Sequence, residues 1–134
     1  MKQNIMLRSS LSHRAADLQQ QAHQLAVEVY TLTLQFPKYE SMVMTPLLRK
    51  LSLSVASNTA KGFSARQSND SIFFMTYANA SCHGIKALSQ IAKDIGYITE
   101  EQNESAKEKC INLSREISMM MDGLEYSEKR RKHR

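Results

Sequence analysis

The sequence predicts an all-α protein, an antiparallel up-down-up-down four-helix bundle. Residues that break helices are few, because the 134 residues include only four Gly and two Pro. Apolar residues recur at alternating steps of three and four along several long segments, as they do in helices that pack in a bundle. The segments between these patterns are short, so neighbouring helices should run antiparallel. A chain of this length suits one domain. We expect the bundle to span residues 1–127.

The first helix is predicted from Leu11 to Phe36. Pro37 should stop it, because proline lacks the backbone donor that the next helical turn needs. The apolar residues of this segment form one seam, made of Leu11, Ala15, Leu18, Ala22, Leu25, Val29, Leu32 and Phe36.

The second helix is predicted to begin with Thr45 as its N-cap and Pro46 in its first turn. It should run to about Ala60, with Gly62 as its C-terminal cap. Its inward-facing residues are predicted to be Leu48, Leu51 and Val55.

The third helix should begin at Ser68 or Asn69 and end at Gly96. Its predicted seam is Phe74, Ala78, Ser81, Ile85, Leu88, Ala92 and Ile95.

The fourth helix should begin with a capping box formed by Thr99 and Gln102. It should end near Tyr126, and its predicted seam is Ala106, Cys110, Leu113, Ile117, Met120 and Leu124. Residues 128–134 should form a basic mobile tail, because they have nothing apolar to bury.

The charge is distributed unevenly along the chain. The net charge is +5, and residues 129–134 (KRRKHR) contain five bases and no acid. Residues 38–93 contain seven bases and two acids, whereas residues 94–128 contain three bases and nine acids. A basic middle and a basic tail attract nucleic acid or an acidic protein surface.

Two polar stripes carry part of this positive charge. Asn79, His83, Lys86, Gln90 and Lys93 share one face of the third helix, and Lys50, Ser54, Ser57 and Lys61 share one face of the second. Such faces could hold phosphates without reading base sequence, or they could be ordinary solvated faces. The tail could bind RNA, DNA or an acidic partner, or it could only keep the protein in solution. The candidate nucleic-acid-binding residues are Arg49, Lys50, Lys61, Arg66, His83, Lys86, Lys93, Lys129, Arg130, Arg131, Lys132 and Arg134.

The sequence contains no pattern typical of catalysis. The four His residues have no metal-ligand spacing with Cys or carboxylates, and no phosphate loop or nucleophile elbow is present. We therefore predict a protein that is not an enzyme and has neither a metal nor a cofactor. Cys82 and Cys110 are predicted to be reduced core residues. With no apolar stretch of the ~20 residues that a membrane span needs, we expect a cytoplasmic protein. Consecutive Met119, Met120 and Met121 cannot all face one core, which suggests a subunit interface.

Three segments together have a recognisable pattern: residues 36–40 (FPKYE), 45–63 (TPLLRKLSLSVASNTAKGF) and 92–98 (AKDIGYI). In their order and spacing they resemble the four-helix-bundle family of 23S rRNA intervening-sequence proteins. The resemblance implies a homopentameric ring. The family includes the accessory variability determinant of diversity-generating retroelements, a basic pentamer that binds its reverse transcriptase and nucleic acid.

The chain departs from the family pattern at three usual acids, which are Lys61, Gly84 and Lys86 here. Loss of acids on the two polar stripes fits a surface that faces nucleic acid. Our leading hypothesis is therefore a non-catalytic scaffold that binds a reverse transcriptase and its RNA or cDNA. The alternative is a protein–protein interaction module with no nucleic-acid role.

Overall fold

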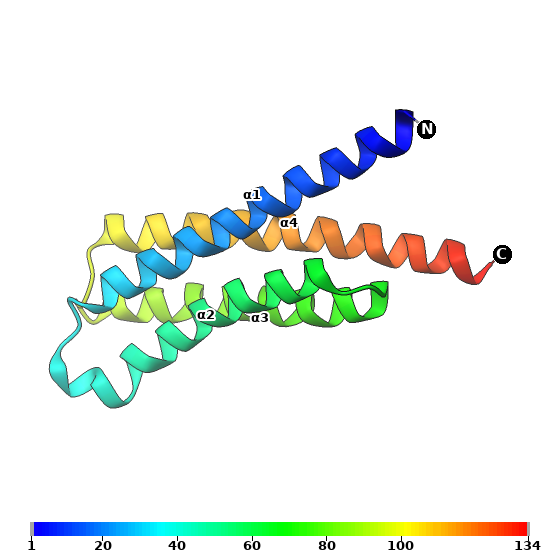
Figure 1. Cartoon of the computed structure of the whole chain (residues 1–134). Helices are drawn as coiled ribbons and strands as arrows, with labels where there is room; N and C mark the ends of the chain where they lie inside the picture. Colours follow the sequence, from blue (N-terminus) through cyan, green and yellow to red (C-terminus); the bar gives the residue numbers. More distant parts are fainter. Residues whose placement is uncertain (1, 134) are drawn as a thin grey trace.

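The computed structural model describes the backbone of residues 2–133 and the side chains of residues 13–133. Within that part of the chain the structure is four α-helices and one short 3₁₀-helix, with no strand. The elements are α1 (Lys2–Thr33), η1 (Lys38–Met42), α2 (Met44–Ser64), α3 (Ser68–Asp94) and α4 (Glu100–Lys132). Chain direction alternates from helix to helix, and both termini lie at the same end (Figure 1). The predicted four-helix bundle is confirmed.

The core follows the predicted seams closely. On α1, the side chains of Leu18, Ala22, Leu25, Val29 and Leu32 are buried, and the side chain of Leu11 lies outside the described residues. On α4 the buried seam is Ala106, Cys110, Leu113 and Ile117. The seam of α3 was partly wrong. Ile95 is 53% exposed, because α3 ends at Asp94, whereas Met75 and Cys82 are buried.

The first two helices differ from their predicted bounds. α1 begins at Lys2 and ends at Thr33, and the chain then tightens into turns in which Phe36 N–H donates to Thr33 O at 3.2 Å. The residue before a proline avoids helical angles, which explains why Phe36 lies outside α1. Thr45 is not the N-cap of α2. Val43 takes that place without a side-chain cap, because η1 brings its carbonyl within 3.3 Å of Leu47 N.

Gly62 is a packing residue and not the predicted C-cap. α2 continues past it to Ser64, and the Gly62 carbonyl accepts a hydrogen bond from the Ser71 hydroxyl of α3. A Cβ at Gly62 would lie 2.7 Å from Met75 Cε, inside the core. The absence of a side chain thus allows α2 and α3 to approach each other.

The two ends of α4 show one confirmed prediction and one difference. Thr99 Oγ1 accepts from Gln102 N–H at 3.1 Å, and Gln102 Oε1 accepts from Thr99 N–H at 2.9 Å, so the capping box is present. The preceding helix, α3, ends at Asp94, and the predicted terminator Gly96 follows its C-cap Ile95 with a φ of +87° that favours glycine. At its other end α4 continues past Tyr126 to Lys132, so most of the expected tail is helical.

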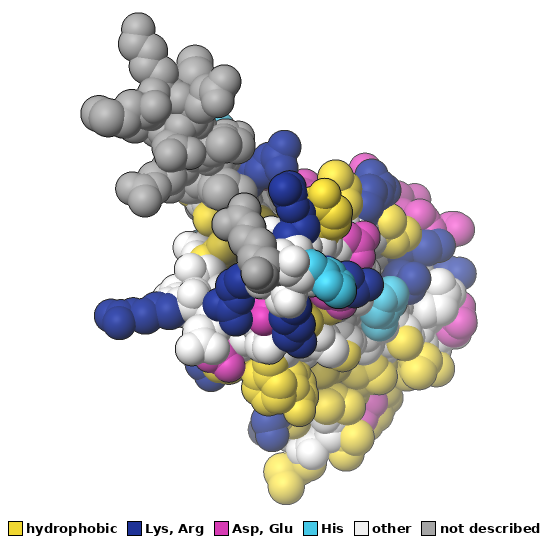
Figure 2. Space-filling model, turned by 90° about the vertical axis from the view of Figure 1, so that its right-hand side faces the viewer, with side chains coloured by type: hydrophobic (Ala, Val, Ile, Leu, Met, Phe, Trp, Pro, Cys, Tyr) yellow, Lys and Arg dark blue, Asp and Glu magenta, His cyan; other side chains and the backbone are white. Residues whose placement is uncertain are grey.

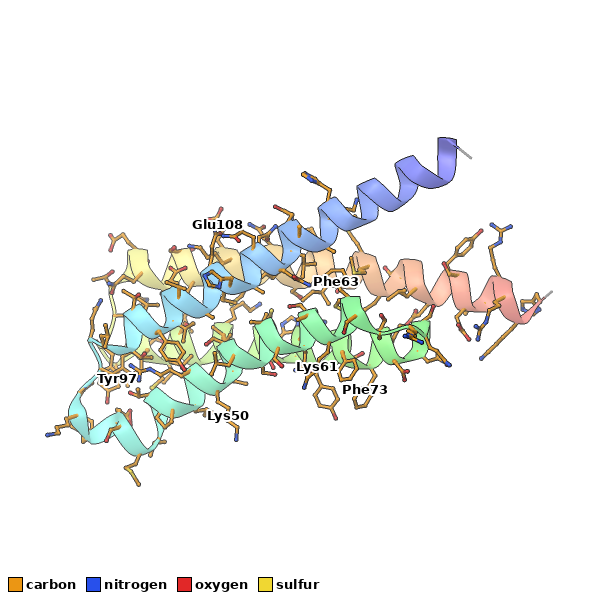
Figure 3. The ribbon with its side chains drawn as sticks, in the orientation of Figure 1. Lys50, Lys61, Phe63, Phe73, Tyr97 and Glu108 are labelled. Carbon is orange, nitrogen blue, oxygen red and sulfur yellow. The ribbon has the colours of Figure 1, made fainter. Side chains whose placement is uncertain are left out.

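Aromatic side chains join the two loops at the end of the bundle away from the termini. The Phe36 and Tyr97 rings lie 5.2 Å apart, and Tyr97 Oη donates to Tyr39 Oη at 3.1 Å. The segments 36–40 and 92–98, which are far apart in sequence, therefore meet here. Tyr97 is labelled at this end in Figure 3.

Arg49 links α1 to α2. Its Nε donates to Thr33 Oγ1 at 2.9 Å, and its guanidinium carbon lies 4.8 Å from the centroid of the Tyr30 ring. The Thr33 hydroxyl in turn donates to the Val29 carbonyl at 2.9 Å. Arg49 is thus half-buried between two helices and already has partners.

Replacing Gly62 with Val should destabilise the fold. The added atoms must displace Met75, which costs about 1–3 kcal/mol of unfolding free energy. Gly123→Val is the matched control, because nothing lies within 4 Å of a Cβ at Gly123. Urea denaturation followed by circular dichroism measures both variants. Equal stability would show that the Gly62–Met75 contact is not a constraint.

Arg49→Met should lower the unfolding free energy by about 1–2 kcal/mol, through loss of the bond to Thr33 and of the stacking on Tyr30. Lys50→Met, at the next and exposed position, should stay within about 0.5 kcal/mol of the parent. Thermal and urea unfolding check the difference, and a Lys50 effect as large as the Arg49 effect would contradict it.

Candidate nucleic-acid interface

The polar stripe of α3 lies against α4. Ser114 Oγ of α4 donates to Asn79 Oδ1 at 2.6 Å, and Asn103 Nδ2 donates to Gln90 Oε1 at 3.2 Å. His83 Nε2 lies 3.4 Å from Ser114 Oγ. The stripe therefore borders the α3–α4 groove and is not a freely solvated face.

The polar stripe of α2 lies on the opposite side of α3. Ser81 Oγ of α3 donates to Ser54 Oγ of α2 at 2.9 Å, and Lys61 Nζ lies 5.8 Å from the centroid of the Phe74 ring. Lys50 and Lys61 are exposed, and both point away from the bundle core in Figure 3. The two stripes thus flank α3 on different sides and do not form one continuous surface.

The α3–α4 groove contains a pocket of ≈ 240 Å³. Its mouth includes the exposed His83 and Arg115 and the half-buried Lys86. Its floor includes the buried thiols of Cys82 and Cys110. Burial raises the pKa of both thiols to about 12, and both are free, as predicted. We call this feature the α3–α4 pocket.

Sequence reasoning missed three polar residues of this pocket, Ser114, Arg115 and Ser118, and the apolar Ile111. Their segment carries more acids than bases, so it was interpreted as acidic. A signal was available in their spacing, because Ile111, Ser114 and Ser118 follow steps of three and four along one face of α4. That face meets the polar stripe of α3.

The last turns of α4 display four consecutive cations, Lys129–Lys132, which we call the basic end. Arg131 Nη2 pairs with Glu128 Oε1 at 3.1 Å, and the Arg130 guanidinium lies 5.8 Å from the Tyr126 ring centroid. All four cations are exposed. Figure 2 views the molecule from the end at which the termini lie, and several Lys and Arg side chains gather there. Arg134 lies outside the described residues.

The remaining candidates are scattered. Lys93 is half-buried, and its Nζ lies 3.5 Å from Asp94 Oδ1. Arg66 is exposed in the short connection between α2 and α3. Arg49 is engaged by α1, as described above. Apart from these three residues, the described candidates fall into three groups: the basic end, the α3–α4 pocket, and Lys50 and Lys61, which we call the α2 lysines.

Exposed apolar side chains lie beside the α2 lysines. Phe73 and Tyr77 are 56% and 54% exposed, with ring centroids 5.0 Å apart. Helical spacing continues this line along α3 to Gly84, where an added Cβ would lie 3.1 Å from Leu51 Cδ1 of α2. We call the exposed set on this side the apolar face: Leu47, Phe73, Tyr77, Ile91 and Ile95. Of the three consecutive methionines, Met119 is exposed, and Met120 and Met121 pack on the core.

The three positions that lack the usual acids have different surroundings. Lys61 borders the apolar face and Lys86 lines the pocket. At position 84, helix packing accounts for the glycine, since a Cβ there would lie 3.1 Å from Leu51 Cδ1. An acidic side chain at this position would therefore require the Leu51 side chain to shift.

In the described part of the chain, no group of three or more His, Cys, Asp or Glu residues could hold a metal ion. None of the helices described is long and apolar enough to cross a membrane.

Comparisons with known proteins agree with the fold. The family model of the 23S rRNA-intervening sequence protein matches residues 14–119. A similar solved structure is a protein of unknown function from the S23 ribosomal protein family of Bacteroides thetaiotaomicron, with 15% identity and a TM-score of 0.74 over 81% of this chain and 98% of that one. No curated protein matches the chain. Because the family model covers most of the bundle, the chain belongs to the family of 23S rRNA-intervening sequence proteins.

Proposed function

We propose that this protein is a non-catalytic, self-associating scaffold that binds nucleic acid. The observation that carries the proposal is the basic end, where a helix that continues to Lys132 displays four cations in succession. A helix spreads consecutive side chains around its axis, so these cations can reach phosphates on more than one side. Contacts of this kind give affinity without sequence specificity. The family description, which refers to 23S rRNA, is consistent with an RNA partner.

The apolar face supports self-association. Exposed apolar side chains that share one side of a small protein are typical of an interaction surface. The α2 lysines flank this face, and the exposed face of α4 carries Glu100, Glu101, Glu104 and Glu108. Figure 3 shows Glu108 and Phe73 on opposite sides of the bundle. Opposite charges on two different surfaces favour a head-to-tail contact between copies, which can close into a ring.

The specific role that fits this combination is an accessory protein, of the kind found with diversity-generating retroelements. In that role a homopentameric ring would hold a reverse transcriptase and its RNA or cDNA by charge complementarity. The second candidate is an interaction module that binds only protein, and the apolar face favours it as well. The two functions differ in whether the basic end contacts phosphates.

A triple variant in which Gln replaces Lys129, Arg130 and Lys132 should bind single-stranded RNA more weakly, and its binding should depend less on salt. Arg131 is kept because it pairs with the buried Glu128. Loss of three phosphate contacts should reduce the slope of log K against log salt by about 2, at roughly 0.7 per contact. Fluorescence anisotropy across a salt series measures the slope.

The matched control neutralises Arg14, Lys38 and Lys107, which changes the net charge equally but leaves the basic end intact. If RNA affinity falls equally in both triple variants, the net charge of the protein determines RNA binding and the basic end is not a specific site. A parent protein that ignores RNA at low salt would remove the nucleic-acid role and favour the protein-only module.

Light scattering should show the protein as a ring-sized oligomer, with five copies as the expected number. Tyr77→Glu together with Ile91→Glu should shift the mass toward one copy, because charges would enter the apolar face. Val27→Glu is the control, since Val27 is exposed to a similar degree (53%) but lies on α1. A parent protein that is monomeric at all concentrations would contradict the ring.

A further inference from the structure

The α3–α4 pocket is built differently from the rest of the surface. Its lining contains three side chains that can carry positive charge, His83, Lys86 and Arg115, and no Asp or Glu. Lys86 and Arg115 make no ion pair with any residue in the described range 13–133. Arg115 also borders a shallow hollow with Glu104 and Glu108, yet neither acid pairs with it. Lys86 and Arg115 are thus left without an ion-pair partner among the described residues.

Hydrogen bonding at the mouth is organised around Ser114. Its hydroxyl hydrogen is directed to Asn79 Oδ1 at 2.6 Å, so the contact of 3.4 Å with His83 Nε2 has the ring nitrogen as donor. This pair of contacts holds the imidazole at the edge of the pocket. Ser118 adds a second half-buried hydroxyl to the lining.

The floor of the pocket increases the effect of these charges. Cys82 and Cys110 are each 1% exposed and, with their raised pKa, stay neutral thiols at physiological pH. The Lys86 ammonium is near enough to the Cys110 thiol to lower its pKa, against the larger effect of burial. Glu28, whose charge also reaches Cys110, is engaged by Lys109 Nζ at 2.6 Å. A neutral floor screens the cations less than water does, so an anion above it is held more strongly.

Size restricts the ligand. At ≈ 240 Å³ the pocket is smaller than the roughly 300–1,000 Å³ of sites that enclose drug-sized molecules. A group of a few heavy atoms with several acceptor oxygens matches both the volume and the donors. Arginine and lysine bind phosphate in complementary ways, since the guanidinium can donate two parallel hydrogen bonds and the ammonium acts as a point charge.

We infer that the α3–α4 pocket binds a single phosphate group, held by Lys86 and Arg115 with the Ser118 hydroxyl, while Ser114 orients the His83 ring at its edge. The group can be free phosphate or the terminal phosphate of a nucleic acid. This site is distinct from the basic end, and it does not require that the basic end binds RNA.

The test titrates the 134-residue protein with inorganic phosphate at constant pH and ionic strength and follows the ring signals of His83 by NMR. The His83 signals are assigned with a His83→Gln variant. We expect a saturable shift that sodium chloride at the same ionic strength does not produce. In the double variant Lys86→Gln with Arg115→Gln, the affinity for phosphate should fall about tenfold or more, as expected for lost hydrogen bonds to a charged group.

The matched control is Lys50→Gln with Lys61→Gln, which removes the same charge from the other side of α3. Affinity for phosphate should remain within about twofold of the parent there, because charges beyond a Debye length are screened. Absence of a saturable shift, or equal weakening in both double variants, would overturn the site. Circular dichroism shows that each variant is folded.

Competition identifies the source of the phosphate. If a 5′-phosphorylated oligoribonucleotide displaces phosphate and its 5′-hydroxyl counterpart does not, the site holds a terminal phosphate. If neither oligonucleotide competes, the site holds the free ion. Retention of RNA by the basic end is measured separately with the triple variant above. The two proposals are therefore tested independently. Failure of RNA binding at the basic end does not contradict the phosphate site, and failure of the phosphate site does not contradict RNA binding.

Discussion

Close approach of α2 and α3 determines the shape of the molecule. At two positions, Gly62 and Gly84, one helix offers no side chain and the other fills the space, with Met75 and Leu51 respectively. These contacts bring the helices close enough for the Ser81 hydroxyl to reach Ser54 and for the Ser71 hydroxyl to reach the Gly62 carbonyl. α3 also packs against α4, so its position relative to α2 decides what its other side presents to α4. The α3–α4 pocket and the apolar face both depend on this placement.

The fold could be predicted largely from the sequence because it depends on local, periodic information. Steps of three and four placed the buried seams, and the Thr99–Gln102 capping box and Gly96 marked the ends around the last loop correctly. The errors occurred where tertiary contacts override local preference. Thr45 has the chemistry of an N-cap, but η1 places Val43 there. Gly62 resembles a helix terminator, but its role is set by Met75 on another helix.

The candidate site was harder to predict, because a surface depends on which helices are neighbours and on which side. The stripes of α2 and α3 were each identified correctly as polar faces, yet their positions on opposite sides of α3 follow only from packing. Arg49 shows the same limit, since nothing in its sequence context distinguishes a link to Thr33 and Tyr30 from a free cation. Arg115 was overlooked because a segment with a net negative charge can still present one basic residue to a neighbouring helix. Charge summed along the chain does not describe charge gathered in space.

The two buried thiols give the bundle an internal chemical reporter. A thiol with a pKa of about 12 has on the order of one thiolate in 10⁵ molecules at neutral pH, and only the thiolate attacks alkylating reagents. Cys82 and Cys110 belong to α3 and α4, so separation of these two helices exposes both thiols and raises their reactivity. The rate of alkylation in the native state therefore reports on opening of this helix pair wherever it exceeds the rate set by global unfolding.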